Sequence, residues 1–165
     1  MYTSFDNMPD SARVWIYQSS REISSEEQKA IATKSTGFLN EWAAHGTGLQ
    51  ASFKFSHNHF LILAVDENVH NASGCSIDAS VSFVKSIAQE YNLDFFDRSK
   101  IAFIFNEELF FESINDIKGK VLAGEISASA LIFNNAITLK KELENNWIIP
   151  AVDSWAGKHF KQLQN

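Results

Sequence analysis

The pattern of hydrophobic and polar positions predicts strands in four segments of the first two thirds of the chain. Between positions 49 and 56 every second residue is apolar, which is typical of a strand with one buried face. Phe60–Val65 is apolar throughout, which predicts an interior strand covered on both faces, or one whose outer face is shielded by the C-terminal region. The β-branched and aromatic residues of Val14–Tyr17 predict a first strand, and Ile101–Phe105 predicts a fourth.

Two segments between these strands show a helical period instead. The first begins at Ser24, whose hydroxyl can accept from the N–H of Glu27 while that carboxylate reaches back, and Gly46 is placed as its left-handed C-terminal cap. The second helix ends near Asn92. The order strand, helix, strand, strand, helix, strand predicts an α+β fold, a ferredoxin-like βαββαβ sandwich, over a core of about residues 12–106.

The rest of the chain, about residues 107–165, predicts a C-terminal α/β extension of that sandwich. The expected elements are a strand at Leu109–Phe111, a helix at Ile114–Ala123, a strand at Ala130–Phe133, a helix from near Leu139, the segment Trp147–Pro150 and a helix at Trp155–Leu163. No linker rich in Pro, Gly or Ser separates the extension from the core. We therefore predict a single domain of residues 1–165.

Composition limits the classes of binding partner and the cellular location that we expect for this chain. The chain has 14 Lys and Arg against 20 Asp and Glu, a net charge of -6, and its basic residues are dispersed, which disfavours nucleic acid and anionic membranes. Cys75 is the only cysteine, so neither an intrachain disulfide nor a Cys-rich zinc site is expected. The first residues do not form a signal peptide and no apolar run reaches a membrane-spanning length, so we predict a cytoplasmic protein. We also predict that it holds no metal or cofactor.

The sequence lacks the phosphate-binding loops of nucleotide enzymes. A Walker A loop needs a glycine five residues before a Gly-Lys pair and a hydroxyl after it, and neither Gly119-Lys120 nor Gly157-Lys158 has these neighbours. The one Gly-x-Gly, Gly46 to Gly48, leads into a strand rather than a helix. These absences predict a chain without ATPase activity.

The start of the second helix offers the most distinctive local segment. Gly74, Cys75 and Ser76 are candidates for anion binding, because a helix N-terminus presents free N–H groups and partial positive charge, which can also activate a thiol. Capping by Ser76 or Asp78 explains the same residues without any ligand.

The predicted topology brings further polar residues to the same sheet edge. The candidate catalytic residues of this edge, called the rim here, are His45, Asp66, Glu67, Cys75 and Asp78. An imidazole, a thiol and carboxylates on one edge suit general acid-base or nucleophilic catalysis. Helix capping and loop hydration are the alternative uses of the same residues.

Five segments carry a resemblance together, at Met8–Arg21, Glu41–Gly46, Ala64–Glu67, Ser73–Asp78 and Asn145–Trp155. They resemble a family of short bacterial proteins that carry the label "ABC transporter ATPase". The label implies ATP binding, whereas no Walker A, Walker B or ABC signature motif is recognisable. Our first prediction is therefore a binding or protein-interaction module for a small molecule or a protein, with homo-oligomerisation left open. The alternatives are a small enzyme that uses the rim, and an ATP-binding protein as the label implies.

Overall fold

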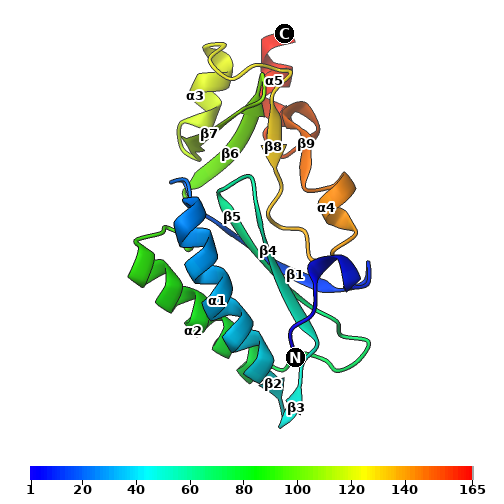
Figure 1. The fold of residues 1–165 in the computed structure, drawn as a ribbon. Coiled ribbons are helices and arrows are strands. Elements are labelled where there is room, and N and C mark those ends of the chain that lie inside the picture. The colour runs from blue at the N-terminus through cyan, green and yellow to red at the C-terminus, as the bar shows by residue number, and fades with distance from the viewer. Residues whose placement is uncertain (165) are drawn as a thin grey trace. The chain divides into compact units, whose positions relative to one another are not determined.

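The computed structural model describes residues 1–164 and shows an α+β protein with three small antiparallel sheets (Figure 1). Contacts divide the chain into two compact units. The first unit comprises Met1–Phe96 and Thr138–Lys141, and the second comprises Asp97–Ile137 and the chain from Glu142 onward. The single domain expected over the whole chain stays a prediction.

The main sheet of the first unit contains three of the predicted strands. They are β1 (Arg13–Gln18), β4 (Ala51–Ser56) and β5 (Phe60–Val65), in the order β1-β5-β4 with both pairings antiparallel. Every residue of β5 is buried, which confirms the interior strand predicted from its apolar run. Strand β4 forms one edge of this sheet.

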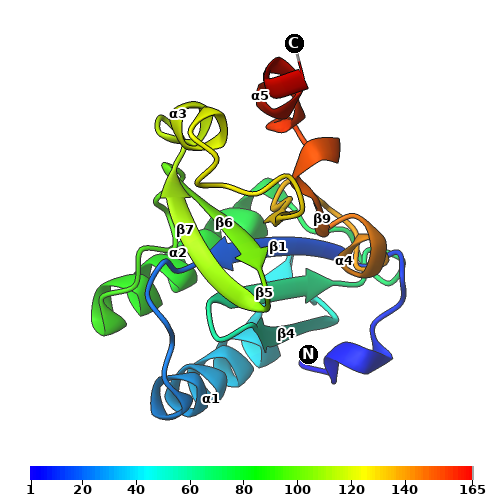
Figure 2. The same ribbon diagram turned by 90° about the horizontal axis from the view of Figure 1, so that it is seen from above.

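Helices α1 (Ser25–Glu41) and α2 (Gly74–Tyr91) lie side by side on one face of this sheet (Figures 1 and 2). The rings of Phe38 and Phe83 stack between them at 4.4 Å. Their buried side chains pack with those of β1 and β5 in one apolar core. Its buried members are Tyr17, Ile23, Ile31, Leu61, Leu63, Val84, Ile87, Leu93 and Phe95.

The helix ends test the predicted caps. The capping box of Ser24 and Glu27 is present, and α2 ends at Asn92 in the left-handed conformation. The cap expected at Gly46 is wrong, because α1 already ends at Trp42 with extended backbone. Gly46 lies instead in the turn of a short hairpin, between β2 (Ala43–Ala44) and β3 (Thr47–Gly48).

Two short segments extend the main sheet at its edges. Tyr2 forms a parallel bridge with Ala51 of β4, and Leu139 forms an antiparallel bridge with Arg13 of β1. The predicted helix from near Leu139 therefore begins later, as α4 (Glu142–Asn145).

The second unit has its own four-stranded sheet in the order β7-β6-β8-β9. The strands are β6 (Lys100–Phe105), β7 (Glu108–Ser113), β8 (Leu131–Phe133) and β9 (Ile148–Pro150). The remaining elements of this unit are α3 (Ile117–Leu122), η2 (Ala151–Asp153), α4, α5 (Gly157–Lys161) and η3 (Gln162–Gln164). Phe103, Ile117, Val121 and Phe160 belong to its apolar core.

The predicted fourth strand is β6. The complete βαββαβ topology requires this strand to pair within the main sheet. Strand β6 pairs with β7 and β8 and belongs to the sheet of the second unit. A tight turn joins β6 to β7, with positive φ angles of 50° at Asn106 and 66° at Glu107, so the nearest strand in sequence is the first partner. The first five predicted elements are thus present in the predicted order within the first unit, as β1, α1, β4, β5 and α2, whereas the complete ferredoxin-like topology is not clearly shown. Over residues 1–164 no helix combines the length and apolar character needed to cross a membrane.

Candidate functional site

His45 occupies the tip of the β2–β3 hairpin, where its side chain is exposed. Its φ of 51° and the φ of 79° at Gly46 form the tight turn; apart from glycine, the residues that adopt a positive φ most often are histidine, asparagine and aspartate. The base of the hairpin is held by a hydrogen bond between the His70 Nε2 atom and the Ala44 carbonyl oxygen, 3.2 Å apart. His45 is therefore presented to solvent by a short, anchored loop.

The two carboxylates that follow β5 shape the next loop. Asp66 is 8% exposed, and its Oδ1 atom accepts from the backbone and side-chain nitrogens of Asn68 at 3.0 and 2.9 Å. Glu67 accepts from the N–H of Ala72 at 3.3 Å and lies 3.5 Å from the guanidinium of Arg13. Both carboxylates therefore have structural partners.

The first turn of α2 is capped internally. The Ser73 hydroxyl accepts from the N–H of Ser76 at 3.2 Å, and the Ser76 hydroxyl accepts from the N–H of Ser73 at 2.8 Å. Ser76 thus takes part in capping as predicted, but the N-cap itself is Ser73 rather than Ser76 or Asp78. Gly74, Cys75 and Asp78 are exposed on this turn.

The rim residues lie on segments that contact one another, but their side chains do not pair. The indole nitrogen of Trp42 donates to the Ser76 carbonyl oxygen at 2.8 Å, which joins the end of α1 to the first turn of α2. Within residues 1–164 no hydrogen bond or ion pair links His45, Cys75 or Asp78 to each other. The same part of the chain contains no group of three or more His, Cys, Asp or Glu placed to hold a metal ion. Catalysis at the rim stays a prediction.

Next to the rim lies an open pocket of about 350 Å³ that sequence reasoning missed. Its walls are Arg13, Glu67, Thr138 and Leu139. The guanidinium of Arg13 also covers the ring of Trp15 at 4.8 Å. Because the opposite charges of Arg13 and Glu67 lie beside each other, the pocket offers little net charge to a ligand. No sequence motif relates positions 13 and 67 to positions 138–139, so the pocket can be recognised only in the folded structure.

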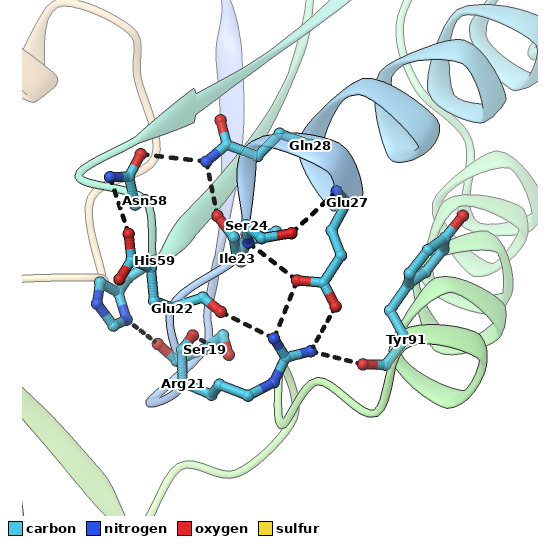
Figure 3. Close-up of polar contacts among 10 residues, drawn as sticks. All are labelled: Ser19, Arg21, Glu22, Ile23, Ser24, Glu27, Gln28, Asn58, His59 and Tyr91. Carbon is cyan, nitrogen blue, oxygen red and sulfur yellow. Dashed lines mark hydrogen bonds and ion pairs between the residues drawn. The ribbon is translucent and has the colours of Figure 1, made fainter.

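A polar network ties the loop after β1 to both helices (Figure 3). Arg21 makes a two-pronged ion pair with Glu27, at 2.9 and 3.0 Å, and donates to the Tyr91 carbonyl oxygen at 2.6 Å. The hydrogen bond with Glu27 raises the pKa of Arg21, and the reciprocal bond lowers the pKa of Glu27. Arg21 therefore anchors the ends of α1 and α2 to one loop.

The other half of this network holds the β4–β5 turn (Figure 3). The side-chain amide of Gln28 donates to Asn58 at 3.1 Å and to the Ile23 carbonyl oxygen at 2.8 Å. Asn58 donates to Glu22 at 3.3 Å, and His59 Nδ1 lies 2.8 Å from the Ser19 carbonyl oxygen. These bonds satisfy the loop groups internally, so the network has a structural role.

The free edge of β4 is a different kind of surface. The Ala51 N–H donates to the Met1 carbonyl oxygen at 3.1 Å, and the Ala51 carbonyl accepts from Thr3 at 3.0 Å. Because backbone groups alternate in direction along an antiparallel strand, those of Phe53 and Phe55 also point away from β5. No hydrogen bond within residues 1–164 occupies these outward groups.

The chain was compared with protein-family models, curated proteins and solved structures, and none of the three comparisons found a match.

Proposed function

We propose that the chain is a cytoplasmic, non-catalytic protein-interaction module that binds an extended segment of a partner protein along β4. The observation that supports it is the row of unoccupied backbone groups at Phe53 and Phe55. An extended peptide adds to such an edge as a further strand, with main-chain hydrogen bonds supplying the affinity.

The chain itself uses part of this edge in the same way. Its residues Met1–Thr3 run beside Ala51 as a short parallel addition to the sheet. Beyond Thr3 the segment leaves the edge for η1 (Phe5–Asn7), so no backbone hydrogen bond within residues 1–164 occupies the outward groups of Phe53 and Phe55. The edge therefore accepts extended chain at one end and is unoccupied at the other.

The open part of β4 is held in strand geometry before any partner arrives. Phe53 and Phe55 pack partly buried against the core beneath α1 and α2, and Phe53 also contacts the ring of Tyr2 at 5.6 Å. Pairing with β5 fixes the other side of the strand. A partner would meet a preorganised edge, which reduces the entropy lost on binding.

The charge on the edge favours a foreign segment over a second copy of this chain. Lys54 lies between the two open positions, with its ammonium over the Phe5 ring at 4.6 Å. Two β4 strands paired edge to edge would bring their Lys54 residues to the same face of one sheet, where like charges repel. A partner segment with an acidic or polar residue at that position avoids this repulsion.

The order of the first five elements supports the ferredoxin-like arrangement for the first unit, and we include that topology in the proposal. The order β1-β5-β4 with two helices on one face corresponds to three of the four strands of such a sheet. The use of an exposed sheet edge for binding is consistent with this fold, although fold alone does not determine function.

Amide hydrogen exchange measured by NMR tests the proposal directly. Peptides selected from a displayed random library against the full chain should slow exchange at Phe53 and Phe55. Exchange at Lys54, whose register pairs it with Ile62 of β5, should not change and serves as the internal control. N-methylation of alternate peptide residues should abolish binding, because it removes the main-chain donors.

Two outcomes would overturn the proposal. Selected peptides that leave the amides of Phe53 and Phe55 unprotected would show that β4 is not the binding edge. A concentration-dependent dimer in light scattering, with both amides protected in the absence of peptide, would assign the edge to a second copy of the chain.

A further inference from the structure

A second surface, on the second unit, combines exposed apolar side chains with unpaired lysines. Three of its members are large apolar residues that remain exposed, Leu122 of α3 at 40%, Trp155 at 47% and Leu163 at 53%. Single exposed apolar residues are ordinary, whereas several on adjoining elements mark a contact surface. We call this surface, with Lys118, Lys158 and His159, the α3–α5 surface.

Ring contacts and spacing place Trp155, His159 and Leu163 on one side of the C-terminal segment. The rings of Trp155 and His159 meet edge to face at 6.5 Å. Leu163 lies four residues beyond His159, where α5 continues into η3, so it falls near the same side. Phe160 points into the core, which directs the neighbouring His159 towards the flank of the helix.

Helix α3 meets α5 through the core and contributes the other side of the surface. Ile117 and Val121 are buried in the same apolar cluster as Phe160. Lys118 and Leu122 follow these two residues by one position each, so both lie along the flank of α3 and both are exposed. Burial, with the nearby charges of Lys158 and Lys118, lowers the pKa of His159, which agrees with this placement.

The two lysines carry charge that the chain does not neutralise. Neither Lys118 nor Lys158 forms an ion pair with any residue of the described chain, whereas Lys120 of the same helix α3 pairs with Glu112. Lys118 and Lys158 are both exposed. Lys118 and Lys158 thus bring two positive charges close to His159, whose ring meets that of the exposed Trp155.

We propose that the α3–α5 surface binds a short acidic segment of a partner protein, with a large apolar side chain of that segment packed against Trp155. Carboxylates on the segment would pair with Lys118 and Lys158. Tryptophan is common among the residues that dominate binding energy at interfaces, and complementary charges at the rim of a contact raise association rates and specificity.

The charge balance favours a peptide over a polyanion. Acidic residues outnumber Lys and Arg in the second unit as in the whole chain, so a nucleic acid or an anionic bilayer would be repelled outside this small area. Two lysines neutralise too few phosphates for appreciable affinity at physiological salt. A short segment with a few carboxylates avoids that repulsion. This inference is independent of the proposed role of β4.

Fluorescence polarisation with the full chain tests the inference. The probe is a fluorescein-labelled peptide of repeated Glu-Leu-Phe units, and the comparison peptide has lysine in place of every glutamate. The acidic probe should bind more tightly than the basic one, and added salt should weaken its binding. The double variant Lys118→Glu with Lys158→Glu, and separately Trp155→Ala, should each weaken binding at least about tenfold.

A matched control separates local charge from total charge. The double variant Lys29→Glu with Lys141→Glu changes the net charge equally at two exposed positions of the first unit and should leave the affinity unchanged. Equal affinity for the acidic and basic probes, or equal losses in both double variants, would overturn the inference. Binding of a single-stranded oligonucleotide or of phosphatidylserine vesicles that is lost with Lys118→Glu and Lys158→Glu would also overturn it, in favour of a polyanion site.

Discussion

The indole nitrogen of Trp42 donates a 2.8 Å hydrogen bond to the carbonyl oxygen of Ser76. Trp42 is only 3% exposed and follows the last residue of α1, while Ser76 lies in the first turn of α2. The bond holds Trp42 where the backbone leaves helical geometry, and α1 ends at Glu41, five residues before the glycine that the sequence offers as its cap. It also sets the position of the β2–β3 hairpin relative to α2.

Replacing Trp42 by phenylalanine tests that bond. Trp42→Phe keeps an aromatic ring but removes the donor and part of the buried volume, so we expect a loss of about 2–3 kcal/mol in unfolding free energy. Urea denaturation followed by circular dichroism measures it. The matched change at an exposed position, Trp155→Phe, should cost less than about 0.5 kcal/mol. Equal effects would show that the Trp42 bond contributes nothing.

Gly157 and Gly119 form a second matched pair. A Cβ atom at Gly157 would lie 2.1 Å from the Val152 carbonyl oxygen, whereas nothing lies within 4 Å of one at Gly119. Gly157→Ala should therefore destabilise the chain by about 2–3 kcal/mol, because backbone must shift. Gly119→Ala in α3 should stabilise it by about 0.5–1 kcal/mol. Thermal melts of both variants measure these changes in stability. A Gly157→Ala variant with the melting temperature of the wild type would contradict the tight packing of η2 on α5.

Asp94 leads to a prediction about how the stability of the fold changes at acidic pH. Burial raises the pKa of Asp94, but hydrogen bonds from the hydroxyl and the N–H of Ser20, at 2.5 and 2.8 Å, outweigh it and leave the pKa below the usual 3.8. A lowered folded-state pKa adds stability that is present above pH 3.8 and is lost as pH falls through the folded value.

The variant Asp94→Asn removes that ionisable group. Because the carboxylate is only partly buried, solvent screens it and we expect a loss of about 1 kcal/mol or less at neutral pH, shrinking towards zero as the wild-type carboxylate protonates. Denaturant titrations between neutral and strongly acidic pH measure the difference between the two proteins. A difference that stays constant down to pH values well below 3.8 would refute the role of Ser20 as a partner of the charged form.

The family label makes a prediction about nucleotides that opposes ours. An ATP-binding protein would be stabilised by ligand, with a melting temperature that rises with nucleotide concentration. Because neither Gly119-Lys120 nor Gly157-Lys158 has the residues of a phosphate loop, we expect magnesium ATP to leave the melting temperature unchanged. Differential scanning fluorimetry with magnesium alone as control tests this expectation, and a saturable upward shift would support the label instead.

The sequence alone predicted several of the local elements. Alternation at 49–56 and the apolar run at Phe60–Val65 identified β4 and the buried β5, and the Ser24 and Glu27 pair identified the start of α1. These features could be read directly because side-chain direction within a strand or a helix turn depends on residues only a few positions apart.

Contacts between distant residues were decided only by the tertiary structure. The sequence could not show that β6 pairs with β7 and β8, that Thr138 and Leu139 complete a pocket beside Arg13, or that Lys118 lies near His159. Hydrogen bonds across a sheet join residues that are far apart in the chain, and so do charge interactions between neighbouring helices. Their pairing depends on which surfaces are buried together when the whole chain folds, and no local pattern records that choice.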